Sequence, residues 1–442
     1  MKKFLVVVLV FLLSCPGSLL AFSGAKAESA HNAAKAFDEL PADAFELREL
    51  GNGTAEIAGV ELGNARNVAI PSKINGRIIT AIGDSAIREK ENLVTLSIPD
   101  TVTSIGEFSF YRCENLKSVT FSDSLESIGY GAFSSCGGLK KVNLPESLIT
   151  LGDFVFMNCS ELETIILPDS LSSIGDGTFN NCFRLTDVVI SPDHPVYAID
   201  NGALINKKEM TMIYFLDHGN TGTYEVPQGI RILADDLFSG SGYSSIILPD
   251  SVSVIGSHAF SHCMNLTEMV LPEGVTSIGS QAFFGCDNLE SLTIPDSLTY
   301  IGSAVFGYSP ALTSIHISPD HPVYEMLDNL LVNKQDMRIV SALNNTPAKY
   351  TLPEGIQQLG FMAFQGSSNL TELVVPEGVT KIGVSAFSGC SKLEKVTLPS
   401  SVTEIADNAF EYSHDLTIMA PAGSYAQQYS QEKGYKFIAI DP

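Results

Sequence analysis

The sequence of 442 residues predicts a repeat solenoid built from coils of about 23 residues. Three observations predict this fold class: an aromatic position recurs every 23 residues, prolines and glycines recur in the same phase, and an offset of 127 residues relates two larger blocks. Because a solenoid grows by adding coils, the length of the chain does not by itself indicate several domains.

The aromatic position, usually preceded by alanine, marks one point in each coil. Within each of three groups it recurs at intervals of 23 residues, with a single interval of 22. The positions are Ile87, Phe110, Phe133, Phe156, Phe179, Phe238, Phe260, Phe283, Phe306, Phe364, Phe387 and Phe410. Prolines such as Pro145 and Pro168, and glycines such as Gly129 and Gly152, repeat in the same phase. A fixed period of this size indicates stacked structural units.

Residues 139–161 show how one coil is predicted to begin. The opening Leu-x-x-Val-x-Leu has the spacing of a leucine-rich-repeat strand. Alternation along this strand turns Val142 and Leu144 inward and Asn143 outward. The inward side chains of one coil cannot be buried without a neighbour, so stacking must stabilise the array. The sequence therefore predicts a leucine-rich-repeat solenoid with a curved parallel sheet on its concave side.

The rest of the coil is predicted to be short and mostly extended. Pro145 can end the strand without losing a needed donor, and residues 148–152 form a second extended segment closed by Gly152. A short helical turn around Phe156 is expected to complete the coil. The solenoid is thus expected to be β-rich, with short helical turns.

The period breaks twice, and both breaks begin with the same heptapeptide, Ser-Pro-Asp-His-Pro-Val-Tyr, at Ser191 and at Ser318. Two longer coils are therefore expected, near 191–226 and 318–352. The alternation that follows each heptapeptide suggests a β-hairpin that projects from the solenoid or lengthens it. A merely oversized coil is the other interpretation, and the sequence leaves both open.

The two ends of the chain do not follow the repeat. Residues 1–27, with two lysines before an apolar run over 4–13, predict a secretory signal peptide, and that run is too short to span a bilayer. Cleavage before Glu28 and a lipoprotein-type cleavage that leaves a lipid anchor on Cys15 both fit. The mature chain is expected to contain a lead-in or cap over 28–59, the solenoid over 60–421, a C-terminal cap over 422–442, and no transmembrane segment.

The charge of the chain excludes one class of partner. It has 26 Lys and Arg against 50 Asp and Glu, a net charge of −24. A protein that binds nucleic acid needs a basic surface to displace counterions from phosphates. We therefore expect no nucleic-acid partner, and basic partners suit this surface better.

The full repeat, L-x-x-V-x-I-P-x-x-V-x-x-I-G-x-x-A-F-x-x-C-x-x-L, resembles the BspA-like leucine-rich-repeat family of secreted and surface proteins over roughly residues 60–421. This resemblance implies a bacterial protein, secreted or on the cell surface, that binds proteins of host or neighbouring cells or of their matrix and is linked to adhesion. One departure from the general leucine-rich-repeat pattern is the lack of an asparagine ladder after the strand. Ser147 and Ser170 stand near that position.

Seven cysteines of the repeats occupy one column of the coil. They are Cys113, Cys136, Cys159, Cys182, Cys263, Cys286 and Cys390. Adjacent coils lie about 4.8 Å apart, which allows disulfides, but a column shared with small residues favours buried free thiols. Metal binding is not expected, because ligands repeated along one edge cannot converge on a tetrahedron.

No other motif indicates chemistry. His258 and His262 stand four apart, as in a zinc protease, but no glutamate base lies between them. His194 and His321 belong to the duplicated heptapeptide and are interpreted as turn residues. The sequence contains no nucleophile elbow or glycine-rich phosphate loop outside the repeat. We therefore expect no enzyme, no catalytic residues, no metal and no cofactor.

The outward strand positions remain as candidates for a binding face. The selected residues are Asn143, Ile166, Val189, Ile247, Val270, Thr293 and His316, in a row that also includes Ser97, Thr120, Val374 and Thr397. Valine and threonine are favoured in any strand, but neighbouring exposed apolar side chains indicate a contact patch. The leading hypothesis is an adhesin-like protein-binding scaffold that uses the concave face. The alternative is a structural or envelope-assembly spacer protein.

Overall fold

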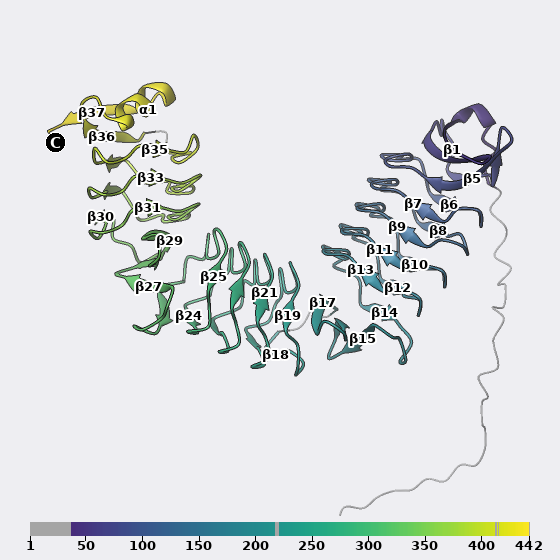
Figure 1. Cartoon of the computed structure of the whole chain (residues 1–442), viewed down its shortest axis with the longest axis horizontal. Helices are drawn as coiled ribbons and strands as arrows, with labels where there is room; N and C mark the ends of the chain where they lie inside the picture. The colour runs from purple at the N-terminus through teal and green to yellow at the C-terminus, as the bar shows by residue number, and fades with distance from the viewer. Residues whose placement is uncertain (1–36, 217–220, 412, 414, 442) are drawn as a thin grey trace, which may run out of the picture. The chain divides into compact units, whose positions relative to one another are not determined.

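The computed structural model describes residues 37–216, 221–411, 413 and 415–441. The predicted signal peptide and Cys15 lie outside these residues. The described chain forms stacked coils, and each regular coil contributes one strand to each of two sets of parallel strands. Figure 1 shows successive coils lying side by side along the chain. The predicted solenoid class, with 23-residue leucine-rich-repeat coils, is confirmed.

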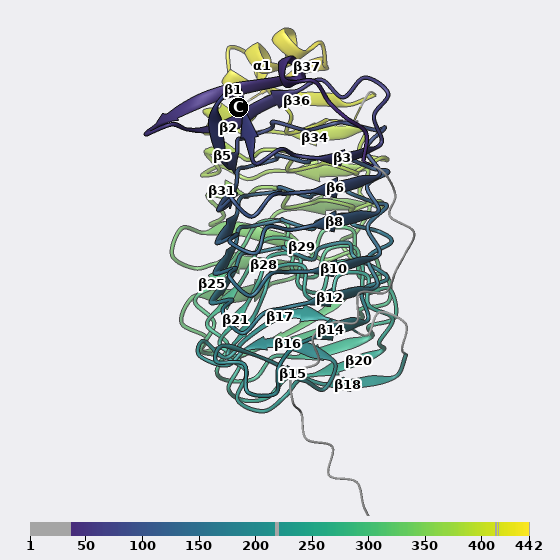
Figure 2. The same cartoon turned by 90° about the vertical axis from the view of Figure 1, so that its right-hand side faces the viewer.

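The first set of strands is mostly three residues long and follows the leucine of each coil. It consists of β3 (Asn67–Ala69), β6 (Thr95–Ser97), β8 (Ser118–Thr120), β10 (Lys141–Asn143), β12 (Thr164–Ile166), β14 (Asp187–Val189), β18 (Thr223–Glu225), β20 (Ser245–Ile247), β22 (Glu268–Val270), β24 (Ser291–Ile294), β26 (Ser314–Ile317), β30 (Lys349–Thr351), β32 (Glu372–Val374), β34 (Lys395–Thr397) and β36 (Thr417–Pro421). Figure 2 shows β6, β8, β10 and β12 one after another along one wall of the stack. In β10, Val142 is buried and Asn143 is exposed, as the alternation predicts.

The second set follows the proline and is mostly two residues long. It consists of β5 (Arg77–Ile82), β7 (Ser104–Ile105), β9 (Ser127–Ile128), β11 (Thr150–Leu151), β13 (Ser173–Ile174), β19 (Ile232–Leu233), β21 (Val254–Ile255), β23 (Ser277–Ile278), β25 (Tyr300–Ile301), β31 (Gln358–Leu359), β33 (Lys381–Ile382) and β35 (Glu404–Ile405). A glycine follows all of these strands except β19 and β35 and allows the preceding coil to approach. A Cβ on Gly152 would lie 2.9 Å from the backbone N of Tyr130, closer than such atoms pack.

The third side of the coil is a turn segment, defined as the residues from three before the aromatic position to three after it. In the segment around Phe156, the N–H of Met157 donates to Phe154 O at 3.1 Å and the N–H of Cys159 donates to Phe156 O at 3.1 Å. Phe154 and Asn158 have positive φ, at 56° and 60°. Phe154 begins the first of these turns and Asn158 lies within the second, and their left-handed conformation prevents a continuous right-handed helix. The predicted short helical turn is therefore a pair of tight turns.

The turn segments of neighbouring coils are joined by a ladder of backbone hydrogen bonds. Phe154, Phe156 and Asn158 donate their N–H groups to the carbonyls of residues 176, 178 and 180 in the next coil, at 2.8–2.9 Å. Each turn segment therefore offers donors to the coil that follows it and carbonyl acceptors to the coil that precedes it. All three sides of the coil are consequently joined to both neighbours.

A ladder of serines replaces the missing asparagines. The hydroxyl of Ser147 donates to Leu125 O at 2.7 Å, and that of Ser170 donates to Leu148 O at 2.6 Å, in each case a carbonyl of the preceding coil. A serine hydroxyl supplies one donor where an asparagine amide has two. The coil therefore keeps the coil-to-coil hydrogen bond with a shorter side chain.

The aromatic column forms the centre of the core. Phe110, Phe133, Phe156 and Phe179 are fully buried, and the rings of Phe133 and Phe179 stack on Phe156 at centroid distances of 5.8 and 6.3 Å. At the first break of the period the column continues through two residues outside the repeat. Tyr214 lies edge-on to Phe179 at 5.6 Å, and Phe215 contacts Phe238 at 5.0 Å.

Each longer coil contains three antiparallel strands. They are β15 (Tyr197–Asp200), β16 (Ala203–Asn206) and β17 (Thr211–Phe215) in the first, and β27 (Tyr324–Leu327), β28 (Leu330–Asn333) and β29 (Arg338–Ala342) in the second. The hairpin, one of the two interpretations of the sequence, is present as β16 and β17, and β15, which the alternation did not indicate, precedes it. The last strand of each trio pairs in parallel with the second set, β17 with β19 and β29 with β31. The hairpins therefore lengthen these sheets.

The ends of the described chain differ from the repeat. At the N-terminal end, η1 (Ala42–Ala44) precedes β1 (Phe45–Gly51) and β2 (Thr54–Val60), which form an antiparallel hairpin on β5, and β4 (Lys73–Ile74) also pairs with β5. At the C-terminal end, α1 (Tyr425–Lys433) and β37 (Lys436–Ile440) follow the last coil. Tyr429 and Tyr435 cover the ring of Phe410, the last of the aromatic column. Both ends shield apolar surface that a further coil would bury.

The seven repeat cysteines are free and buried. Their thiols donate to a carbonyl of the preceding coil, for example Cys159 Sγ to Phe133 O at 3.3 Å. Ser309 occupies the same column and makes the equivalent bond, to Phe283 O at 2.8 Å. The column is therefore a row of buried donors, as the preference for packed thiols predicts.

We expect alkylating reagents to label all seven of these thiols in unreduced, denatured protein, and none of them in the native protein. The reason is twofold: the thiols are buried, and burial raises the pKa of Cys113 to about 11, so little reactive thiolate forms. Mass spectrometry of the alkylated peptides measures the result. Fewer than seven labelled repeat thiols after denaturation would indicate disulfides.

Candidate interaction surface

The predicted binding residues all lie on the outward face of the first strand set, at the last or next-to-last residue of their strands. This placement follows from the strand alternation, because the preceding residue of each strand points into the core. The row does not run along one uninterrupted sheet. The structure divides it among separate sheets, which the sequence analysis did not anticipate.

The first group joins Asn143, Ile166 and Val189. These residues are direct partners in the register of β10, β12 and β14, so their side chains lie next to one another. Asn143 and Val189 are exposed, Val189 by 41%, and Ile166 is half-buried between them. The predicted apolar pair of Ile166 and Val189 is therefore brought together.

The second group joins Val270, Thr293 and His316 through the register of β22, β24 and β26. Val270 is 65% exposed although it lies in a strand. His316 Nε2 lies 3.3 Å from the hydroxyl of Ser314, and both side chains are on the outward face. This group is more polar than the first and ends in a side chain that can donate or accept a hydrogen bond.

Ile247 stands apart from both groups. It is 50% exposed, and its strand β20 pairs with β18, where the partner of Ile247 is Glu225. The strands β20 and β22 contact each other but belong to different sheets. Ile247 and Val270 thus lie on adjacent coils without the ladder that would fix their side chains side by side.

A third group was only partly predicted. Val374 and Thr397 are followed in register by Met419 of β36 and Ile438 of β37, and Ile438 is 50% exposed. Met419 lies at the end of the last coil, 22 residues after Thr397, and Ile438 lies in the C-terminal cap, so the 23-residue period did not assign them to the outward row. The apolar run Phe437–Ile440 is a signal that could have indicated a strand at Ile438.

The side chains considered for chemistry are held in structural roles. His258 and His262 occupy the two left-handed positions of one turn segment, with φ of 56° each, so they do not share the face of a helix. Among residues 37–216, 221–411, 413 and 415–441, no three His, Cys, Asp or Glu side chains are grouped to hold a metal ion. Within the same ranges, no helix has the length and apolar character needed to cross a membrane.

Comparison with known proteins identifies the repeat. Six copies of the BspA type leucine-rich-repeat region match residues 80–211, 212–334 and 342–425. No curated protein matches. The related proteins found are leucine-rich-repeat scaffolds of bacteria, and none carries the name of an enzyme.

The chain is similar to several solved structures. A leucine-rich-repeat protein from Bacteroides ovatus is 22% identical, with 92% of this chain and 100% of that chain covered and a TM-score of 0.45. The pneumococcal vaccine antigen PcpA is 18% identical, with 90% and 97% covered and a TM-score of 0.51. A leucine-rich cell surface protein from Faecalibacterium prausnitzii is 23% identical, with 90% and 94% covered and a TM-score of 0.38. The family model matches most of the length of this chain. The chain therefore belongs to the BspA type leucine-rich-repeat family of bacterial proteins.

Proposed function

We propose that this protein is a non-enzymatic, adhesin-like scaffold that binds other proteins outside the cell through the outward face of its first strand set. The observation that carries the proposal is the exposure of Val189, Ile247 and Val270 on strands whose alternate residues fill the core. Exposed apolar side chains on a regular face have no core to fill and typify contact surfaces. Membership of a family of bacterial surface proteins supports the same function.

Replacing Ile166, Val189, Ile247 and Val270 together with glutamate is expected to abolish capture of partner proteins and leave the circular dichroism spectrum unchanged. Charged side chains in these positions would have to lose water on contact with an apolar partner surface. Capture is measured with immobilised protein and extracts of host extracellular matrix.

A matched control uses four exposed apolar residues away from this face, Ile149, Ile199, Tyr300 and Val384, also changed to glutamate. This variant adds the same charge and should capture partners as the unchanged protein does. Undiminished capture by the first variant would contradict the proposal. Capture of proteins from the bacterium's own envelope fraction, with none from host matrix, would support the spacer protein instead.

We propose further that residues 1–27 export the chain, and that the mature protein is either released or held by a lipid on Cys15. The basic and apolar pattern of this segment supports export. Growth with a radioactive fatty acid separates the two routes. Label that is lost in a Cys15→Ser variant indicates the lipid anchor, and absence of label indicates release.

A further inference from the structure

The first turn segment of the stack, residues 84–90, has one side of its hydrogen-bond ladder open. Its N–H groups donate to the next coil, as in the other turn segments. The donors are Ser85, Ile87 and Glu89, at 2.7–2.8 Å from carbonyls of the next turn segment. In that next segment the accepting carbonyls belong to residues 107, 109 and 111. One period of 23 residues earlier, the equivalent carbonyls are those of Asp84, Ala86 and Arg88. No described residue donates a hydrogen bond to these three.

The open side results from the path of β2. The carbonyl of Ile57 still accepts the N–H of Gly83 at 2.8 Å, as in a regular coil. Beyond that point β2 does not follow the turn segment, and its last residues pair with β1 instead, Gly59 with Glu46 and Val60 with Phe45. The chain that would normally cover the carbonyls is thus directed away from them.

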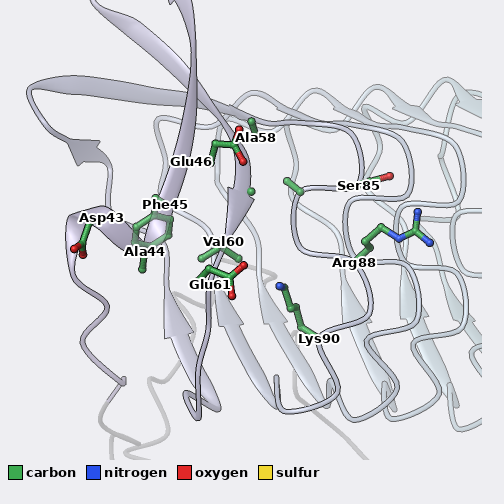
Figure 3. A pocket seen from close by; sticks show the side chains of 12 residues that line it. Asp43, Ala44, Phe45, Glu46, Ala58, Val60, Glu61, Ser85, Arg88 and Lys90 are labelled. Carbon is green, nitrogen blue, oxygen red and sulfur yellow. The ribbon is translucent and has the colours of Figure 1, made fainter.

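A groove of about 280 Å³ lies where the missing segment would run. Figure 3 shows its two walls, with Phe45, Glu46 and Val60 on the hairpin and Ser85 and Arg88 on the first turn segment. Four of the residues that line it are small: Ala44, Ala58, Gly59 and Ala86. Ala86 and Arg88, which bear two of the three open carbonyls, line the groove, so a polypeptide backbone has room to approach them.

The groove is acidic. It adjoins a second cavity of about 340 Å³, and the two share Glu61 and Lys90. The acidic residues that line them are Asp43, Glu46, Glu61, Glu89 and Glu91, against the two cations Arg88 and Lys90. Arg88 is already paired with Glu89 at 2.8 Å. A ligand in this groove meets an excess of negative charge.

The opposite end of the described chain has a different arrangement. There the hydroxyl of Tyr435 donates to Phe410 O at 3.0 Å, and that of Tyr429 donates to carbonyls of Ala406 and Asp407 at 3.3 and 3.4 Å. The cap at this end supplies donors to backbone carbonyls of the last coil. By the direction of the ladder, the last turn segment has no following coil to accept its N–H groups, so its open side carries donors, whereas the open side of the first turn segment carries carbonyls.

We infer that this groove binds an extended, basic segment of a partner polypeptide, whose alternate N–H groups donate to the carbonyls of Ala86 and Arg88, the two open carbonyls whose residues line the groove. Strand addition of this kind takes its affinity from backbone hydrogen bonds and its selectivity from the surrounding side chains. Here the acidic lining residues select lysine or arginine, and the small lining residues admit a backbone. The site is separate from the outward strand face and does not depend on binding there.

The test uses the full mature protein and a fluorescent nonapeptide of alternating lysine and threonine, acetylated and amidated at its ends. A twin peptide, N-methylated at its five central residues, keeps the charge but lacks the central donors. We expect the parent peptide to bind and the twin to bind more than about tenfold more weakly, because the twin lacks the N–H groups that donate to the open carbonyls. Fluorescence anisotropy measures both affinities.

Two substitutions test the location. Ala58→Phe fills the groove and Glu61→Lys reverses one of its charges. Each should weaken the binding of the parent peptide. Their controls are Ser172→Phe and Glu126→Lys, at exposed positions of other coils. Thermal melting shows whether each variant is folded. If Ala58→Phe does not fold, Glu61→Lys alone tests the location of the site.

The inference is overturned if the parent peptide does not bind, if the N-methylated twin binds equally well, or if the groove variants bind like their controls. The outward-face variant with four glutamates should bind the peptide as the unchanged protein does. The groove variants should likewise retain capture through the outward face. Failure of one site is therefore distinguishable from failure of the other.

Discussion

Replacing Phe156 with alanine is expected to lower the free energy of unfolding by about 3–5 kcal/mol. The Phe156 ring is fully buried and stacks on both neighbouring rings of the column, so its removal leaves a cavity that the rigid coil ladder cannot close. Because each coil is stabilised by its neighbours, the loss should weaken the coils on both sides. Denaturant unfolding followed by circular dichroism gives the change in free energy.

Asn143→Ala, in the same coil, is the control for this prediction. Asn143 is exposed and points away from the core, and its replacement should change the free energy of unfolding by no more than about 0.5 kcal/mol. Similar losses for the two variants would show that the aromatic column does not carry the stability of the stack.

His321→Ala is expected to destabilise the protein by about 3 kcal/mol or more, because three buried backbone groups lose their partner at about 1–3 kcal/mol each. His321 is fully buried, its Nδ1 accepts the N–H groups of Val323 and Tyr324 at 3.1 and 3.0 Å, and its Nε2 lies 3.1 Å from Pro295 O. With Nδ1 accepting, the proton lies on Nε2 and is donated to the proline carbonyl. The imidazole joins the start of the longer coil to the coil before it.

The same contacts predict a dependence on pH. Burial lowers the pKa of His321, while the bond to Pro295 and the nearby Asp296 raise it and Lys334 lowers it. A histidine with a lowered pKa is neutral in the folded state, so its contribution is fully present above the unfolded pKa of about 6.5. It decreases as the pH falls below that value toward the lowered pKa of the folded state.

Thermal melting between pH 7.5 and pH 5 measures this dependence, with His321→Asn as the matched variant. The asparagine oxygen can accept the same two backbone N–H groups but does not titrate and is too short to reach Pro295. This variant should be less stable than the unchanged protein at pH 7.5 and should lose less stability on acidification. An equal loss in both proteins would rule out His321 as the titrating group.

The sequence alone predicted the parts of the fold that repeat. The 23-residue phase identified Val142 as inward and Asn143 as outward, and the single cysteine column indicated buried thiols. The offset of 127 residues predicted that His194 and His321 have equivalent roles, and they do: His194 also accepts two backbone N–H groups and lies 3.0 Å from Pro168 O. A periodic pattern is informative because equivalent positions of every coil are buried against the neighbouring coils in the same way.

Periodicity was less informative where neighbouring coils differ. At the first break Tyr214 and Phe215 continue the aromatic column, whereas the equivalent residues of the second break are Ser341 and Ala342. The two longer coils, alike in strand order, are therefore packed differently. Since duplicated segments diverge one side chain at a time, the 127-residue offset predicts the path of the backbone and not its contacts.

The candidate sites divide in the same way. The sequence by itself determined that Ile166, Val189, Ile247 and Val270 face outward, because strand alternation is a local property of the chain. Only the tertiary structure decided which of them are neighbours, and that Met419 and Ile438 extend the outward row. It also decided that three carbonyls of the first turn segment stay open, because that depends on how β2 pairs with β1 instead of with the coil beside it. Hydrogen bonding between distant segments sets this choice, and no pattern within one coil encodes it.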